Sequence, residues 1–144
     1  RLWTNPDAYL ERLKRFQYVF TPDFSPYADF PKAVQVFNHF RKHWIGAYLQ
    51  ENGVRVIPTV TWSYPPSYDF CFDGEPKNSV VAISSVGCMK SKRNKQMLID
   101  GYNEMVKRLE PSCIIFYGMV PDECKGNIIR VKPFQNKFKK AVCG

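Results

Sequence analysis

Two apolar runs separated by an amphipathic segment are the feature that most constrains the fold. Residues 79–86 and residues 113–117 are almost continuously apolar, which is typical of strands buried on both faces of a sheet. Between them, residues 93–109 repeat apolar side chains at helical spacing. Because parallel strands joined by a helix form a right-handed crossover, this order predicts a parallel βαβ unit.

The N-terminal half of the chain shows the same alternation. Residues 16–21 and 54–60 predict two strands, with a long helix over residues 29–51 between them, a short helix after Pro6 and a last strand at residues 128–131. We therefore expect an α/β fold with a mainly parallel sheet of about four to five strands and flanking helices. Four principal strands cannot close an eight-stranded barrel, so the sheet is either open or part of a (β/α) barrel-like fold.

The predicted long helix carries an apolar stripe, which we expect to pack against the core. His39 and His43 lie off this stripe, so we expect them at the surface. They are spaced as in a zinc-protease helix, but Phe40 stands where the general-base glutamate would be. We therefore predict no metal site. The stripe consists of Ala33, Phe37, Phe40, Trp44, Ala47 and Tyr48.

Composition places the chain among ordinary folded proteins. With 144 residues, of which 44% are hydrophobic, we expect a single α/β domain over residues 1–144. The chain begins at Arg1 rather than at a methionine, so we expect it to lack an N-terminal portion. No apolar run is long enough for a membrane span, and the five cysteines form no close pair. We therefore expect no membrane partner, reduced thiols and a cytoplasmic location.

Positive charge is concentrated in the C-terminal third. Residues 90–144 hold twelve basic and five acidic side chains, which account for +7 of the net +8. This asymmetry favours an anionic partner, either nucleic acid or a nucleotide, although solubility alone would also explain it. The turn and helix start at residues 87–95 and the basic tail are the predicted phosphate contacts. Their cations are Lys90, Lys92, Arg93 and Lys95 in the turn and Lys137, Lys139 and Lys140 in the tail.

Polar side chains follow the predicted strands where a parallel sheet places ligands. We predict a strand-end pocket from these residues. We also single out the carboxylates Asp69, Asp73 and Glu75 of the long loop, which could bind a divalent ion or act as acid and base with Asp23 across the strand ends, or simply form a solvated turn. Ordinary turn chemistry is the alternative for each of them. The predicted pocket residues are Trp62, Ser63, Ser84, Ser85 and Tyr117, and the candidate catalytic carboxylates are Asp23, Asp69 and Asp73.

Several longer motifs resemble a bacterial and phage family known as domain of unknown function forty-four seventeen. They are Thr-Pro-Asp-Phe-Ser-Pro-Tyr at residues 21–27, Ile-Pro-Thr-Val-Thr-Trp-Ser at residues 57–63 and Asp-Phe-Cys-Phe-Asp-Gly at residues 69–74. The resemblance covers most of the chain and implies an origin in bacteria, phages or other mobile elements. It implies no activity or cofactor. Its motif positions include Asp23, Trp62, Asp69, Asp73 and Ser85.

Three functions therefore remain open. The first is binding of nucleic acid or a nucleotide phosphate through residues 87–95 and the tail, in a protein of a bacterial mobile element or phage. The second is a small-molecule enzyme that uses the strand-end carboxylates. The third is an inhibitor that binds a host or phage protein. No cofactor is identified by any motif in the sequence.

Overall fold

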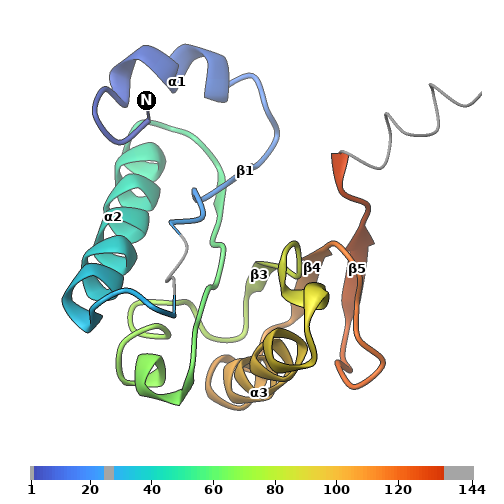
Figure 1. Ribbon diagram of the computed structural model, residues 1–144. Coiled ribbons are helices and arrows are strands. Elements are labelled where there is room, and N and C mark those ends of the chain that lie inside the picture. The colour runs from blue at the N-terminus through green and yellow to red at the C-terminus, as the bar shows by residue number, and fades with distance from the viewer. Residues whose placement is uncertain (1, 25–27, 135–144) are drawn as a thin grey trace, which may run out of the picture. The chain divides into compact units, whose positions relative to one another are not determined.

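The computed structural model describes residues 2–24 and 28–134 and shows an α/β fold, as predicted. The chain divides into two compact units, Arg1–Glu75 and Pro76–Gly144 (Figure 1). The five strands are all parallel to their neighbours, but they form two sheets, one of two strands and one of three. Among the described residues, no helix is long and apolar enough to cross a membrane.

The N-terminal unit contains a small sheet and one long helix. Its strands β1 and β2 pair in parallel over only two residues, with Val19 opposite Val56. Beyond the two strands, two further hydrogen bonds join Thr21, which directly follows β1, to Thr59, which follows β2 after Pro58. The Thr59 amide donates to Oγ1 of Thr21 and the Thr59 hydroxyl donates to the Thr21 carbonyl, both over 2.8 Å. The elements are α1 (Asp7–Leu13), β1 (Val19–Phe20), α2 (Lys32–Glu51), β2 (Val56–Ile57) and the 3-10 helix η1 (Pro65–Asp69).

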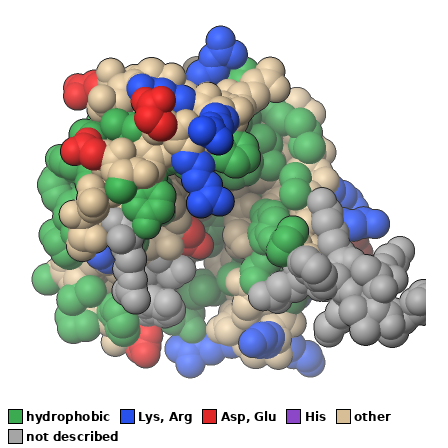
Figure 2. Space-filling model, turned by 90° about the horizontal axis from the view of Figure 1, so that it is seen from above, with side chains coloured by type: hydrophobic (Ala, Val, Ile, Leu, Met, Phe, Trp, Pro, Cys, Tyr) green, Lys and Arg blue, Asp and Glu red, His purple; other side chains and the backbone are tan. Residues whose placement is uncertain are grey.

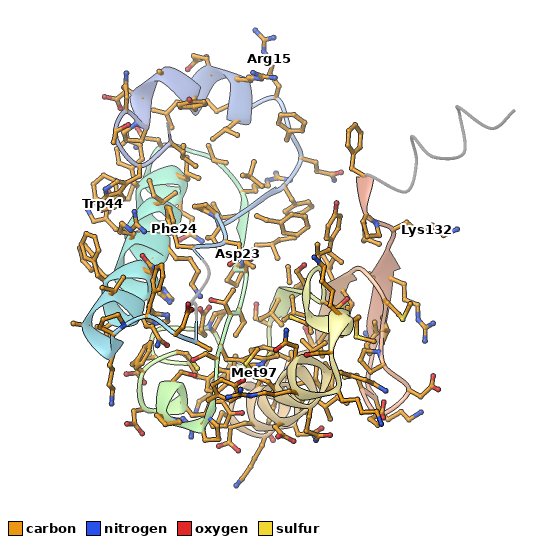
Figure 3. All side chains as sticks on the ribbon, viewed as in Figure 1. Arg15, Asp23, Phe24, Trp44, Met97 and Lys132 are labelled. Atoms are coloured by element: carbon orange, nitrogen blue, oxygen red, sulfur yellow. The ribbon has the colours of Figure 1, made fainter. Side chains whose placement is uncertain are left out.

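The buried face of α2 is not the predicted one. The side chains of Phe37, Phe40 and Trp44 are 50%, 53% and 41% exposed, so the expected packing of the aromatic stripe is wrong. Figure 3 shows Trp44 on the side of α2 that faces away from β1. The opposite face is buried, and the part of it nearer the N-terminus of α2 is polar. Its residues are Gln35, Asn38, Lys42, Ile45, Gly46 and Leu49.

The apolar end of that buried face forms the core of the N-terminal unit. Ile45 and Leu49 are fully buried and pack with Val54, which follows the end of α2. Gly53 lets the chain turn there with φ +81°, so that the Val54 amide can donate to the Leu49 carbonyl over 2.9 Å. Side chains from α1 and both strands, including Leu10, Leu13, Val19 and Val56, cover this cluster.

The C-terminal unit follows the predicted βαβ pattern closely. Strand β4 lies between β3 and β5, and all three strands are parallel. The predicted face of α3 is buried, and its Tyr102 ring contacts Phe116 of β4. In Figure 1, α3 lies beside the three-stranded sheet. The elements are β3 (Val80–Ser84), the 3-10 helix η2 (Cys88–Lys90), α3 (Lys92–Leu109), β4 (Cys113–Tyr117) and β5 (Ile128–Val131).

The four cysteines of the described residues are free thiols. Cys71 and Cys124 are buried, whereas Cys88 and Cys113 are partly exposed. Burial raises the pKa of the Cys124 thiol to about 11. A thiol with such a pKa is neutral and weakly nucleophilic near pH 7. Cys143 lies outside the described residues.

Candidate functional site

A cluster of ionisable side chains lies inside the N-terminal unit, between α2 and the end of the long loop. Lys42 of α2 and Glu75 of the loop form its centre, with side chains that are 2% and 0% exposed. The Lys42 ammonium donates to Oε1 of Glu75 over 2.6 Å. A buried charge is costly unless it is paired, so these two groups hold each other in place.

Two histidines from the same helix complete the cluster. Nε2 of His43 lies 3.1 Å from Oε1 of Glu75, although off the direction of a hydrogen bond. Burial acts to raise the pKa of Glu75, but the contacts from His43 and Lys42 outweigh it and hold the pKa below its usual value. Glu75 is therefore a carboxylate at neutral pH. Its second oxygen, Oε2, is buried and accepts no hydrogen bond from the described residues.

His39 is held in one tautomer by the loop. Its Nε2 lies 2.8 Å from the backbone carbonyl of Asp73. A carbonyl can only accept, so Nε2 carries the proton and the lone pair of the neutral ring lies on Nδ1. Burial and the charge of Lys42 lower the pKa of His39, which favours this neutral form.

Three consecutive loop residues thus touch the two imidazole rings. Asp73 binds His39, Glu75 contacts His43, and Gly74 between them packs beneath the His43 ring. A Cβ atom at Gly74 would lie 3.3 Å from Cε1 of His43, and the backbone there has φ +72°. Both observations favour glycine at this position. The ring centroids of His39 and His43 are 4.4 Å apart.

Donor atoms of this cluster are close enough to share an ion. One ligand atom each from His39, His43 and Glu75 lies within 4.8 Å of the others, and these three form the only such group among the residues that the structure describes. The prediction that the histidines are simple surface residues is therefore incomplete, because both rings are partly buried against the loop. The buried polar residues Gln35, Asn38 and Lys42 do recur at helical spacing, but a polar row of this kind is equally typical of a solvent-exposed helix face, so the sequence alone does not identify it.

The three carboxylates that the sequence selected as catalytic are all exposed. Oδ2 of Asp69 accepts from Lys32 over 2.8 Å in a solvent-exposed pair, and Asp73 enters the cluster through its backbone carbonyl. Asp23 lies on the segment that follows β1 (Figure 3). Glu75, for which a solvated turn was the favoured interpretation, is instead the buried carboxylate of this loop.

The predicted pocket residues are divided between the two units. In the N-terminal unit, Trp62 is buried near Phe72, and the hydroxyl of Ser63 donates to Gln35 of α2. In the C-terminal unit, Ser84 and Tyr117 are paired across β3 and β4. Ser85 follows directly, and its amide donates to the Tyr117 carbonyl. Its hydroxyl is buried and has no hydrogen-bond partner among the described residues.

The predicted phosphate-binding turn links β3 to α3 in the C-terminal unit. Gly87 adopts φ +86°, and Ser91 caps α3 by accepting a hydrogen bond from the Asn94 amide. Lys90, Lys92 and Arg93 are exposed. Lys95 binds Glu123 in an exposed pair over 3.2 Å. The basic tail residues Lys137, Lys139 and Lys140 lie outside the described residues.

Comparison with known proteins identifies relatives of this chain. It is 42% identical over 118 residues to a "Gene 1 protein" of Mycobacterium phage L5, an alignment that covers 82% of this chain and 52% of that protein. It is 40% identical over 117 residues to a "Gene 1 protein" of Mycobacterium phage D29, covering 81% and 43%. The chain thus spans about half the length of the curated relatives it matches.

No solved structure matches the chain. Residues 1–135 match the family model described as a domain of unknown function, DUF4417, and this agrees with the resemblance seen in the sequence motifs. The chain has relatives in mycobacterial phages and belongs to the DUF4417 family.

Proposed function

We propose that the C-terminal unit of this phage-family protein binds the phosphates of nucleic acid. The observation that carries the proposal is the division of charge between the units. Residues 76–144 hold thirteen basic and five acidic side chains, a net of +8, whereas residues 1–75 hold eight of each. The whole net charge therefore belongs to one compact unit, which attracts polyanions more strongly than the same charge spread over the chain.

The turn between β3 and α3 is where we place the first phosphate contact. The turn is led by a positive-φ glycine and followed by a helix N-terminus. Such a combination is suited to anions, because backbone amides and the positive end of the helix dipole both attract negative charge. Three exposed cations, Lys90, Lys92 and Arg93, lie within four positions there. Cations at a helix start are unfavourable for the helix itself, so a bound anion would compensate them.

Lys95 fits the same interpretation. Its partner Glu123 is half exposed, and solvent screens a surface ion pair of this kind, so that it contributes little to stability. A phosphate can therefore replace the carboxylate at little cost. Lys137, Lys139 and Lys140 would extend the contact along the nucleic acid.

Binding to a fluorescent oligonucleotide at several salt concentrations tests the proposal. We expect the affinity to fall steeply with salt, and replacement of Lys90, Lys92, Arg93 and Lys95 by Ala to reduce the slope of log K against log salt by up to about 3 units. The charge-matched control replaces four exposed cations of the N-terminal unit, Arg12, Lys14, Arg15 and Arg55. Equal losses in the two quadruple variants would show a diffuse charge effect and would contradict a site at residues 87–95.

A further inference from the structure

We propose that His39, His43 and Glu75 form a binding site for a divalent transition-metal ion in the N-terminal unit. The three residues offer one ligand atom each within 4.8 Å of one another. This site lies in a different unit from the proposed nucleic-acid contact and does not depend on it.

The donor set has the chemistry of a transition-metal site. Two imidazole nitrogens and one carboxylate oxygen bind Zn²⁺ in hydrolases and Fe²⁺ in the facial triad of non-haem iron enzymes. Calcium and magnesium prefer sites made of oxygen ligands alone. His39 and His43 are one helical turn apart, so α2 presents them on the same face, and the loop brings Glu75 to them.

The hydrogen bond made by the other ring nitrogen of His39 matches those of histidines in known metal sites. A histidine that binds a metal usually donates its other ring N–H to a carbonyl or carboxylate, which fixes the tautomer. The contact between His39 and the Asp73 carbonyl does this, and leaves the Nδ1 lone pair for a ligand.

An unpartnered oxygen of Glu75 is the second independent observation. Oε1 is occupied by Lys42 and contacts His43, whereas Oε2 is fully buried and has no hydrogen-bond partner in the described residues. A buried carboxylate oxygen without a partner is costly, and a bound cation would remove this cost. The Nε2 atom of His43 is likewise buried without a hydrogen bond.

The geometry of the cluster must contract slightly to bind an ion. Ligand atoms around tetrahedral Zn²⁺, at about 2.1 Å from the metal, are separated by about 3.4 Å. Small side-chain rotations of His43 and Glu75 supply the remaining movement. The Lys42 ammonium repels a dication, and because it binds Oε1, it directs the metal to Oε2.

Three protein ligands leave one position of a tetrahedral ion open. The side chain of His43 is 31% exposed, so part of this ring is in contact with solvent. Three protein ligands and one solvent-accessible position are typical of catalytic rather than structural zinc sites. We therefore expect an exchangeable water or a substrate atom in the remaining position.

Metal titration of the full chain tests the site. After treatment with a chelator, the protein is titrated with Zn²⁺ by calorimetry and with Co²⁺ by visible absorption. We expect one equivalent of each ion to bind, and a Co²⁺ spectrum without thiolate charge-transfer bands. His39→Gln and His43→Gln should each weaken Zn²⁺ binding by at least about 10–100-fold.

Controls separate this site from folding effects and from thiols. Asp69→Asn changes an exposed carboxylate of the same loop and should leave metal affinity unchanged. Far-UV circular dichroism shows whether each variant is folded, and His39→Gln is the milder change because a glutamine amide can also donate to the Asp73 carbonyl. Absence of stoichiometric binding, affinity unchanged in both folded histidine variants, or cobalt bound by cysteine would overturn the proposal.

Discussion

The ammonium of Lys42 lies 2.6 Å from Oε1 of Glu75, and both side chains are almost completely removed from solvent. A second short pair, Lys32 with Asp69 at 2.8 Å, also joins α2 to the long loop but is exposed. The two pairs connect the same elements with the same chemistry. They differ in burial, so they separate the effect of burial from that of charge.

Breaking the buried pair should strongly destabilise the N-terminal unit. We expect Lys42→Met to lower the free energy of unfolding by about 3–5 kcal/mol, because it leaves a buried carboxylate without its cation. Lys32→Met should cost about 0–1 kcal/mol. Urea denaturation followed by circular dichroism measures both. Similar costs for the two variants would contradict the burial of Lys42.

A close contact between two strand ends gives a second prediction. Gly118 has φ +110°, and a Cβ atom there would lie 2.5 Å from the buried Ser85 hydroxyl oxygen. Gly118→Ala therefore combines backbone strain with a clash. Gly87→Ala is the matched control, since its φ of +86° imposes strain but nothing lies within 4 Å of the added atom.

We expect Gly118→Ala to lower the free energy of unfolding by about 1–3 kcal/mol more than Gly87→Ala does. Adding Ser85→Ala to Gly118→Ala should restore part of the loss, because the clashing oxygen is removed. Denaturation midpoints of the four proteins test this. A double variant no more stable than Gly118→Ala would mean that strain alone causes the effect.

How much of the fold could be predicted differs between the two units. In the C-terminal unit, β4 and β5 begin and end where the sequence predicts, because continuous apolar runs bounded by turns leave little choice. In the N-terminal unit, the strands are much shorter than predicted. Residues 16–21 and 54–60 have the composition of strands, but only Val19–Phe20 and Val56–Ile57 pair.

The candidate metal site could not be found by periodicity. Helical spacing assigned the aromatic face of α2 to the core, whereas the fold buries Lys42 and Asn38 on the other face. A polar face is buried only if its charges find partners, and the partner of Lys42 is 33 positions away. Local patterns do not report such a long-range pair, which is why Glu75 was assigned to a solvated turn.

The hydroxyl of Tyr102 leads us to expect that the folded protein becomes less stable in alkaline solution. Burial and the neighbouring Cys124 raise the pKa of its hydroxyl from 10.0 to about 12, and this hydroxyl donates to the Lys125 carbonyl over 2.5 Å. The folded state therefore favours the protonated form. Its contribution to stability is complete below pH 10 and is lost as the pH rises toward 12.

We expect Tyr102→Phe to be less stable than the wild type at neutral pH by about 1 kcal/mol, and the difference to shrink above pH 10. Tyr18→Phe, at an exposed position, is the control and should follow the wild-type curve. Denaturant unfolding at a series of pH values gives both curves. A Tyr102→Phe difference that stays constant to pH 12 would contradict the raised pKa.

The two faces of α2 give the most direct test of how this helix packs. Phe40 is 53% exposed, and Trp3 reaches its ring only from the edge, whereas Ile45 is fully buried in the core of the unit. The space-filling view shows other hydrophobic side chains at the surface (Figure 2), so exposure of Phe40 is not exceptional.

Ile45→Ala leaves a cavity and should lower the free energy of unfolding by about 2–5 kcal/mol. Phe40→Ala removes more atoms but should cost less than about 1 kcal/mol, because most of them already contact water. If urea unfolding instead gave the larger loss for Phe40→Ala, the aromatic face would be the packed one, and the buried position of Lys42 would no longer stand.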